Sequence, residues 1–290
     1  DALPISATES LLEDMYTGAY PYAPFALDLL MDSLGIYHTN PRLFYVPRQP
    51  ALGAYNTDFG DELYMIEEHP SEGHGSLGSF GFASEIESTR DLLEKLREDE
   101  KYHLDRGAYI RARLFDMLIG DWDRHQDQWR LAKFEMSGDS IVYRPIPRDR
   151  DQVFSIMGDG WIGALLTRMV PEVRKMEGFR PEIRKLRDFN TNPYALDRTL
   201  LSATDRADWI AQAGAIRKTL SARLIDRSFR EGLPPEVRDE TLERIRDIML
   251  SRLQGLEETA LAYYRMLQDK PVLFGTDKDD WFRIAGTADG

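Results

Sequence analysis

The segment Leu118–Trp129 reads LIGDWDRHQDQW, and a second segment, Tyr143–Phe154, reads YRPIPRDRDQVF. A mostly apolar helix from Asp105 to Ile119 is predicted to lead into the first segment, with short strands over Trp129–Phe134 and Ile141–Ile146 between the two. Because such a strand pair returns the chain to its starting point, we expect the second segment beside the first. Four or five carboxylates gathered in this way repel one another unless a cation is bound.

Hard oxygen ligands of this kind suit Mg²⁺ or Mn²⁺, with phosphate oxygens as the remaining ligands. The plainer alternative is a solvated acidic loop whose arginines form surface ion pairs of little energetic value. Each segment alone favours the alternative, whereas the two together favour a metal site.

Composition narrows the class of protein. The chain has 290 residues, of which 42% are hydrophobic, and a formal net charge of −13. This length allows one large domain or two small ones, and the hydrophobic content is too high for a disordered chain. The acidic balance argues against nucleic-acid binding, and no apolar run is long enough to predict a membrane span. The absence of cysteine excludes disulfides and cysteine-ligated metals.

Periodicity and turn residues predict the other elements. The N-terminal part is expected to be helical, followed by a β-hairpin with a long connection and then a glycine-rich loop. From Gly160 onward the chain reads as mainly helical, and the last twenty residues as the start of a β unit. The predicted helices are Ser6–Tyr16, Tyr22–Leu34 (ending at Gly35), Ser84–Glu100 and one opened by Pro234-Pro235 and running to Gln268; the predicted strands are Leu43–Val46, Glu62–Ile66, Val272–Phe274 and Trp281–Ile284.

The two acidic segments resemble the catalytic apparatus of atypical kinases of the HipA, CotH, secretory-pathway and phosphatidylinositol-kinase types. The resemblance rests on Asp123-Arg124-His125, an amide at Gln128, a strand pair and a further Asp before Phe154. In that pattern the first Asp accepts the proton of the phosphate acceptor, while an Asn and the later Asp hold the metal. The resemblance therefore implies Asp123 as catalytic base and Arg124 and His125 as residues that brace its loop. It implies Gln128 and Asp149 as metal ligands, with Asp151 as the alternative register.

This sequence departs from the kinase pattern in two respects. Gln128 stands where the family has Asn, which keeps the acceptor oxygen but lengthens the arm. A kinase also needs a strand lysine and a glycine-rich flap over the ATP phosphates, yet the first lysine here is Lys95, after the predicted hairpin. We expect flap and lysine to lie upstream of Asp1 in a larger protein. Glu67 and Glu68 fall where the adenine-binding hinge would be, although solvation of a strand end is the commoner reason for such a pair.

A second resemblance covers most of the chain. Segments 36–41, 66–70, 112–117 and 120–125 are similar to an uncharacterised family of large Bacteroidetes-type envelope proteins. In that family the region lies between a metallophosphoesterase-like domain and an outer-membrane barrel. The resemblance implies the remaining domains of a larger chain as partners and a periplasmic or outer-membrane-associated location.

We therefore expect an α+β fold with a mainly helical, protein-kinase-like C-lobe. Residues 1–70 are predicted to form a partial N-lobe, 71–270 the C-lobe, and 271–290 the start of a following β segment. The expected activity is ATP- and Mg²⁺-dependent phosphoryl transfer to an unknown acceptor, with little or no turnover by this segment alone. A pseudokinase-like scaffold module and a metal-dependent phosphohydrolase remain as alternatives.

Overall fold

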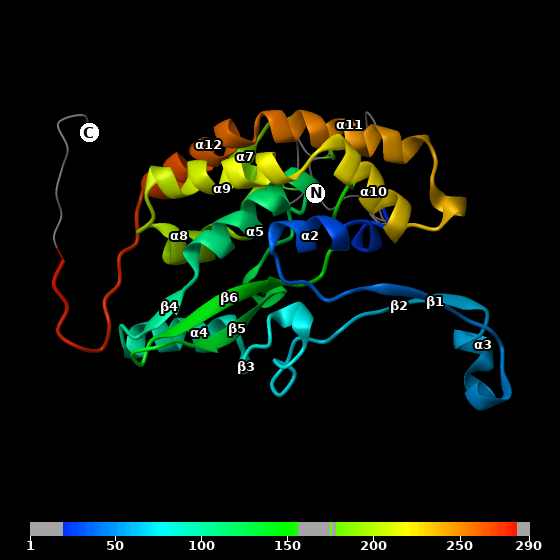
Figure 1. Ribbon diagram of the computed structural model, residues 1–290, viewed down its shortest axis with the longest axis horizontal. Helices are drawn as coiled ribbons and strands as arrows, with labels where there is room; N and C mark the ends of the chain where they lie inside the picture. Colours follow the sequence, from blue (N-terminus) through cyan, green and yellow to red (C-terminus); the bar gives the residue numbers. More distant parts are fainter. Residues whose placement is uncertain (1–19, 156–174, 176–177, 283–290) are drawn as a thin grey trace, which may run out of the picture.

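The computed structural model describes residues 20–155, 175 and 178–282. The fold is α+β, as predicted: a layer of helices covers one face of a four-stranded sheet, and a two-stranded ribbon projects from one end (Figure 1). The predicted helix Ser6–Tyr16 and most of the segment after Gly160 up to 177 lie outside the described residues.

The four-stranded sheet has the order β3-β5-β6-β4. Its centre is the antiparallel pair β5 (Trp129–Glu135) and β6 (Ile141–Pro147), which confirms the predicted strands. At one edge β3 (Glu85–Ser88) pairs antiparallel with β5, and at the other β4 (Tyr102–Leu104) pairs parallel with β6. At one end of this pair the first acidic segment enters β5 and the second leaves β6.

Helix α5 (Arg106–Ile119) is the most buried helix of the body. Ten of its 14 residues are buried, and Asp105 caps its N-terminus by accepting a hydrogen bond from the backbone N–H of Ala108 at 2.9 Å. Tyr109 on α5 stacks on Trp129 of β5, with ring centroids 4.7 Å apart. The stacking fixes the start of the helix against the strand that follows the first acidic segment.

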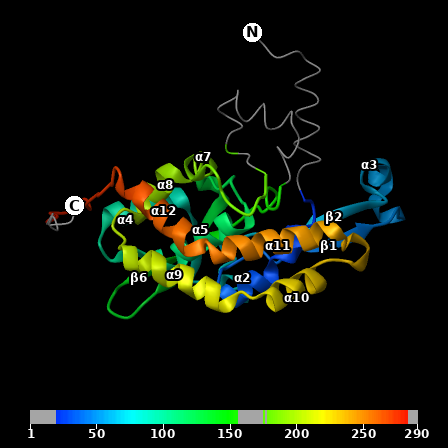
Figure 2. The same ribbon diagram turned by 90° about the horizontal axis from the view of Figure 1, so that it is seen from above.

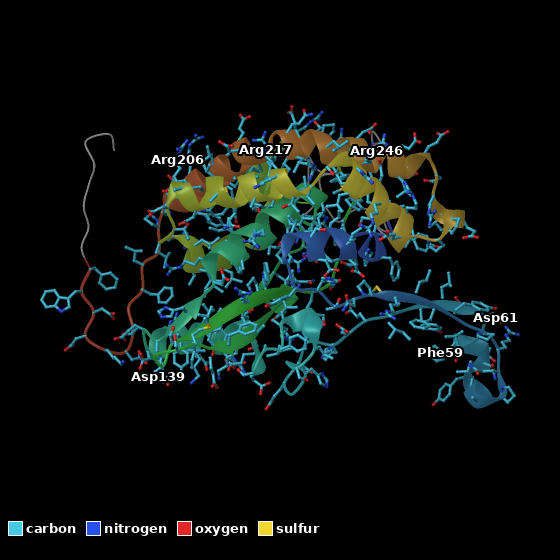
Figure 3. All side chains as sticks on the ribbon, in the orientation of Figure 1. Phe59, Asp61, Asp139, Arg206, Arg217 and Arg246 are labelled. Carbon is cyan, nitrogen blue, oxygen red and sulfur yellow. The ribbon has the colours of Figure 1, made fainter. Side chains whose placement is uncertain are left out.

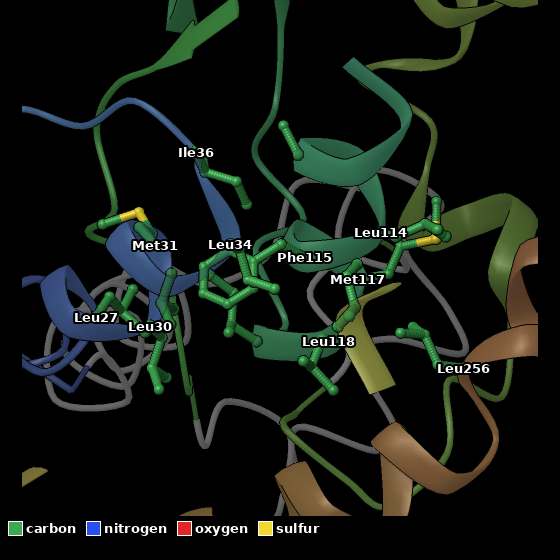
Figure 4. Close-up of a cluster of buried hydrophobic side chains, with 14 of the residues drawn as sticks. Leu27, Leu30, Met31, Leu34, Ile36, Leu114, Phe115, Met117, Leu118 and Leu256 are labelled. Atoms are coloured by element: carbon green, nitrogen blue, oxygen red, sulfur yellow. The ribbon is translucent and has the colours of Figure 1, made fainter. Parts of the chain in front are cut away.

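The remaining helices pack around α5, with α9, α11 and α12 above it and α2 and α10 at one end (Figure 2). Together they bury one large apolar core, in which side chains of α2 meet those of α5 (Figure 4). The helices are α2 (Asp28–Leu34), α4 (Thr89–Glu98), α7 (Leu186–Phe189), α8 (Tyr194–Leu201), α9 (Arg206–Thr219), α10 (Ala222–Gly232), α11 (Glu240–Gln254) and α12 (Leu256–Gln268), with short 3-10 turns at η1 (Pro24–Ala26), η3 (Gly78–Phe80), η4 (Gln126–Gln128) and η6 (Pro235–Val237). Of these, α4 packs against strands β3, β4 and β5 rather than around α5.

The projecting ribbon, called the arm below, spans residues 42–66. It consists of β1 (Arg42–Val46) and β2 (Glu62–Ile66), paired antiparallel, and a tip formed by η2 (Pro50–Tyr55) and α3 (Asn56–Phe59). The hairpin was predicted with nearly these bounds. Figure 3 places Phe59 and Asp61 at the far end of the arm, away from the helices.

Three predicted helices differ in the structure, and one strand was not predicted. The predicted helix Tyr22–Leu34 is the 3-10 turn η1 followed by α2, which begins only at Asp28. The predicted helix Ser84–Glu100 starts as strand β3, and its helical part begins only after Ser88, whose side chain caps α4. The long helix predicted from Pro234-Pro235 to Gln268 is two helices, interrupted at Gly255. The prolines open only the 3-10 turn η6, and α11 begins at Glu240. The parallel edge strand β4 was not predicted.

The C-terminal β segment is not present among the described residues. Val272–Phe274 is not in a strand; instead the backbone N–H of Val272 donates to Ser202 Oγ at 3.0 Å. Trp281 and Phe282 also lie outside any strand, and Ile284 is beyond the described residues. Extended chain without a neighbouring strand gains no ladder hydrogen bonds, so the local pattern alone was insufficient. No described helix is both long and apolar enough to cross a bilayer.

Candidate functional site

The first acidic segment begins where α5 ends. Gly120 has a left-handed backbone, with φ 81°, and terminates the helix. A Cβ atom at this position would lie 2.7 Å from the ring of Phe179, so both the conformation and the space require glycine. The sharp turn directs residues 121–128 away from the helix axis and toward the sheet.

The second acidic segment lies directly beside the first, as predicted. The register of the central strands places Trp129 opposite Pro147, and the backbone N–H of Arg148 donates to the Gln128 carbonyl at 2.8 Å. The backbone N–H of Phe154 then donates to the carbonyl of Ile119 at 3.2 Å, back at the end of α5. Residues 121–128 and 148–154, the site loops, are thus fastened to each other at both ends.

A buried charge network underlies the site loops. Arg150 donates to Asp121 at 2.8 Å and also to Asp116 of α5, while Arg124 pairs with both of these carboxylates. All four residues are at most 7% exposed. Burial would raise the pKa of Asp116, but Arg124, Arg150 and Arg113 outweigh it and hold that pKa below its ordinary value. Buried charges are tolerated here because each has an opposite partner.

The same network reaches the helices behind the loops. Arg113 donates to Asp116, to Asp197 of α8 and to Asn190, each at 2.7 Å. The hydroxyl groups of Tyr109 and Tyr263 donate to Asp197 at 2.8 and 2.6 Å. Polar contacts therefore join α5, α8 and α12 under the loops and restrict their movement.

Arg124, predicted as a bracing residue, is completely buried. Its guanidinium donates to the carbonyl of Gln128 at 3.2 Å and to the carbonyl of Arg148, so it connects the two loops. Such a side chain positions the loops and does not reach a substrate. His125 is different: its side chain is 44% exposed, and its Nε2 lies 3.4 Å from Gln128 Nε2.

The predicted metal ligands meet at the point where the loops touch. Gln128 Nε2 donates to Asp149 Oδ2 at 3.0 Å, and the carboxyl group of Asp151, whose Oδ2 accepts from Gln152 Nε2 at 3.0 Å, lies near that of Asp149. Desolvation and the neighbouring Asp149 carboxylate raise the pKa of Asp151 to about 6. Gln128, Asp149 and Asp151 therefore form one polar cluster.

The side-chain oxygen of Gln128 is unusual. Gln128 is 6% exposed, yet its Oε1 has no hydrogen-bond partner among the described residues. A buried carbonyl oxygen without a partner is costly and calls for a donor or a cation. Within the described residues, no three His, Asp or Glu side chains are arranged to enclose a metal ion. A cation here would therefore use amide oxygen, carboxylates and ligands supplied by a bound phosphate.

Asp123 lies in the same loop but has another partner. Its Oδ1 accepts a hydrogen bond from Asn192 Nδ2 at 2.5 Å, and Asn192 Oδ1 accepts from Lys175 Nζ at 3.0 Å. Asn192 and Lys175 were missed by sequence reasoning. The turn residues Asn190-Thr191-Asn192-Pro193 mark a loop, but nothing local shows that it folds back onto a residue 69 positions earlier.

Glu67 and Glu68, the predicted nucleotide-binding pair, lie at the base of the arm. Thr39 donates to Glu67 at 2.6 Å, and Asn40 and Ser79 donate to Glu68. These bonds attach the arm to the body. Neither glutamate forms a hydrogen bond with the site loops, and their nucleotide-binding role stays a prediction.

Comparison of the chain with family models, with curated proteins and with solved structures gives no match. The chemistry of the site therefore has to be inferred from its own residues.

Proposed function

We propose that the site loops form the metal-binding and acceptor-binding half of an ATP-dependent phosphotransferase of the atypical-kinase type. The observation that carries the proposal is the buried, unpartnered Oε1 of Gln128 beside the carboxyl groups of Asp149 and Asp151. Clustered oxygens that lack enough hydrogen-bond donors are suited to a hard divalent cation.

The residues fit Mg²⁺ bound together with a nucleotide. Mg²⁺ is usually held by one or two carboxylates plus substrate phosphates rather than by a complete protein cage. Gln128 and Asp149 would hold it here, with Asp151 as the alternative carboxylate. When bound, the ion would neutralise charge on the phosphate oxygens of ATP.

Asp123 is assigned as the catalytic base. Its carboxylate would take the proton of an acceptor hydroxyl while the acceptor oxygen bonds to the γ-phosphorus and ADP leaves. Asn192 occupies Oδ1 of that carboxylate, which supports Oδ2 as the atom that faces the acceptor. Arg124 and Arg150 keep both loops in place through the buried charge network.

A second candidate, a pseudokinase-like binding module, is favoured by one contact. Gln128 donates its N–H to Asp149, so two proposed ligands satisfy each other in part without a metal. The longer arm of glutamine compared with asparagine permits this contact. A module of this kind would bind a partner without turning over ATP.

Titration calorimetry with Mn²⁺, with and without a non-hydrolysable ATP analogue, tests the proposal. We expect Mn²⁺ to bind, and to bind more tightly when the analogue is present. Asp149→Asn should weaken Mn²⁺ binding at least about tenfold, because a charged oxygen ligand is lost. Asp139→Asn is the matched control: Asp139 is exposed in the turn between β5 and β6, far along the strands from the loops, and its variant should bind as the parent does.

The other outcomes separate the alternatives. Binding of Mn²⁺ that the nucleotide does not change favours a phosphohydrolase. Absence of binding in the parent chain, or equal binding by Asp149→Asn, contradicts the metal site and leaves the binding module.

A further inference from the structure

Exposed large apolar side chains are concentrated in the arm. Its 25 residues hold seven of the 13 large hydrophobic side chains that are exposed among the described residues. They are Phe44, Tyr45, Tyr55, Phe59, Leu63, Met65 and Ile66. Because side chains alternate along a strand, these residues occupy both faces of the ribbon. An isolated two-stranded ribbon is at best marginally stable in water, so further strands are expected beside it.

The arm is nevertheless an ordered element. Asp61 accepts hydrogen bonds from the hydroxyl of Tyr45 and the backbone N–H of Arg48, at 3.0 and 3.1 Å. Asn56 exchanges hydrogen bonds with the backbone of Gln49 at the tip, both at 2.8 Å. Contacts within the arm thus hold its shape while the apolar side chains stay exposed.

The outer edge of β1 has a defined set of hydrogen-bonding groups. The Val46 carbonyl accepts from the backbone N–H of Asp61, so it faces β2. In an antiparallel ladder alternate residues face the partner strand, and therefore Leu43 and Tyr45 direct their N–H and C=O groups away from β2. Pro41 and Pro47, on either side, have no N–H group to offer.

These features make the β1 edge complementary to itself in one register. If two β1 strands pair antiparallel about Phe44, Leu43 of each copy faces the partner's Tyr45, and all four available N–H groups find a carbonyl. A register centred on Tyr45 sets Leu43 against a proline and Arg42 against the partner's Arg48, and one centred on Leu43 sets Tyr45 against a proline. Like charges directly opposite each other are unfavourable.

The edge of β2 is less suitable. Pairing two β2 strands about Tyr64 would set Asp61 opposite the partner's Glu67, a like-charge pair. In the β1 register, by contrast, Arg48 comes opposite the partner's Asn40, whose amide donates to the carboxylate of Glu68. Arg48, which pairs with Asp61 of its own arm at 3.2 Å, is thereby brought to the acidic base of the other arm.

We propose that two copies of the chain associate through the β1 edges of their arms, in an antiparallel pairing centred on Phe44. The result is a continuous four-stranded sheet, β2-β1-β1-β2, with a body at each end. The interface is isologous and closed, so association stops at a dimer. This proposal is independent of the proposed phosphotransferase activity.

Sedimentation velocity over a range of concentrations tests the association. The chain of 33.4 kDa is expected to shift reversibly to twice that mass as concentration rises. A single species of monomer mass at the highest soluble concentration would overturn the proposal.

A charge swap at the symmetry axis tests the register. Phe44 is 45% exposed, so Phe44→Lys and Phe44→Glu should leave thermal unfolding of the monomer unchanged. Each variant alone sets like charges against each other and should raise the dimer dissociation constant about tenfold. Mixing the two variants should restore the dimer. Dimers that persist in both separate variants, or a mixture that stays monomeric, would refute pairing about Phe44.

The absence of cysteine permits a second, direct test. Residues at the axis of an antiparallel pair lie close enough for a disulfide, so Phe44→Cys should cross-link rapidly under mild oxidation. Met136→Cys, at an exposed position outside the arm, is the matched control and should cross-link only slowly. Equal rates for the two variants would contradict the proposed contact.

Discussion

The body buries charged side chains beneath the site loops, whereas the arm exposes apolar ones. Beneath the site loops, Arg113, Arg124 and Asp116 are fully buried among ionic partners. In the arm, Leu63 and Ile66 are more than half exposed. Burying charge and exposing hydrocarbon both cost free energy in an isolated chain.

The contrast suggests what each region does. A paired, buried charge network holds loops in a fixed geometry, which is what a site for phosphoryl transfer requires. An ordered apolar ribbon with open edges is suited to association. The free energy of unfolding should therefore depend strongly on the network and hardly at all on the arm. Three pairs of variants, and one variant compared with the parent chain, test this difference.

Breaking the network should have the largest effect. Arg124→Met removes one of the cationic partners of Asp116 and Asp121 and the bonds to the Gln128 and Arg148 carbonyls, so the free energy of unfolding should fall by about 3–5 kcal/mol. Urea denaturation measures it. Arg217→Met is the control, because Arg217 forms only an exposed pair with Glu257 and its loss should cost less than about 1 kcal/mol. Similar losses in both variants would mean that the network is not stabilising.

Substitution at the turn that opens the first site loop should have the second-largest effect on stability. Gly120→Ala places a Cβ atom against Phe179 and forces alanine into the left-handed conformation of position 120. The free energy of unfolding should fall by about 1–3 kcal/mol. Gly214→Ala is the matched substitution inside α9, where a Cβ meets no atom within 4 Å. The free energy of unfolding of that variant should rise by about 0.5–1 kcal/mol. Thermal unfolding of the two variants should shift in opposite directions, and shifts of the same sign would refute the requirement at Gly120.

The stability contributed by the junction between body and arm should depend on pH. His38, just before the arm, pairs with Asp28 and Asp32 of α2 at 3.3 and 3.0 Å. Burial opposes its charged form, but the two carboxylates outweigh burial and raise the pKa of His38. The stabilisation is thus complete below the unfolded-state pKa and is lost as pH rises through the folded-state pKa.

Comparison with His38→Gln isolates this contribution from other titrating groups. The parent should be more stable than the variant by about 1 kcal/mol in mild acid, and the difference should shrink in mild alkali. Urea denaturation at several pH values measures it. A difference that grows with pH would contradict the assigned charge on His38.

Shortening a side chain of the arm should have the smallest effect on stability. Leu63→Ala removes an exposed side chain and should change unfolding free energy by less than about 0.5 kcal/mol under monomeric conditions. Leu118→Ala, the same substitution in the core of α5, should cost about 2–5 kcal/mol. Equal costs would show that the arm packs as part of the body.

Much of this architecture could be predicted from local sequence. The bounds of β2, helix α5, the strand pair β5–β6 and the resulting contact between the site loops followed from periodicity and turn residues. Gly35 and Gly120 end their helices in left-handed conformations, a requirement visible in the sequence.

Features that depend on distant residues could not be predicted. Residues 85–88 form a strand only because β5 is available to pair with them, and their own pattern continues a helix. Asn192 and Asp197 join the site through contacts across 69 and 84 residues, which no local pattern records. Arg113 and Asp116 are charges within the apolar C-terminal half of α5, and a search for their partners would have pointed toward the network.

The most direct test of the metal site is a crystal structure determined from crystals soaked in Mn²⁺ and a non-hydrolysable ATP analogue. Anomalous scattering then locates the metal. The proposed function predicts an anomalous peak between the site loops, with Gln128 Oε1 and an Asp149 carboxylate oxygen each about 2.1 Å from it. A peak elsewhere, or none while the Gln128–Asp149 hydrogen bond persists, would contradict the shared cation on which the proposal rests.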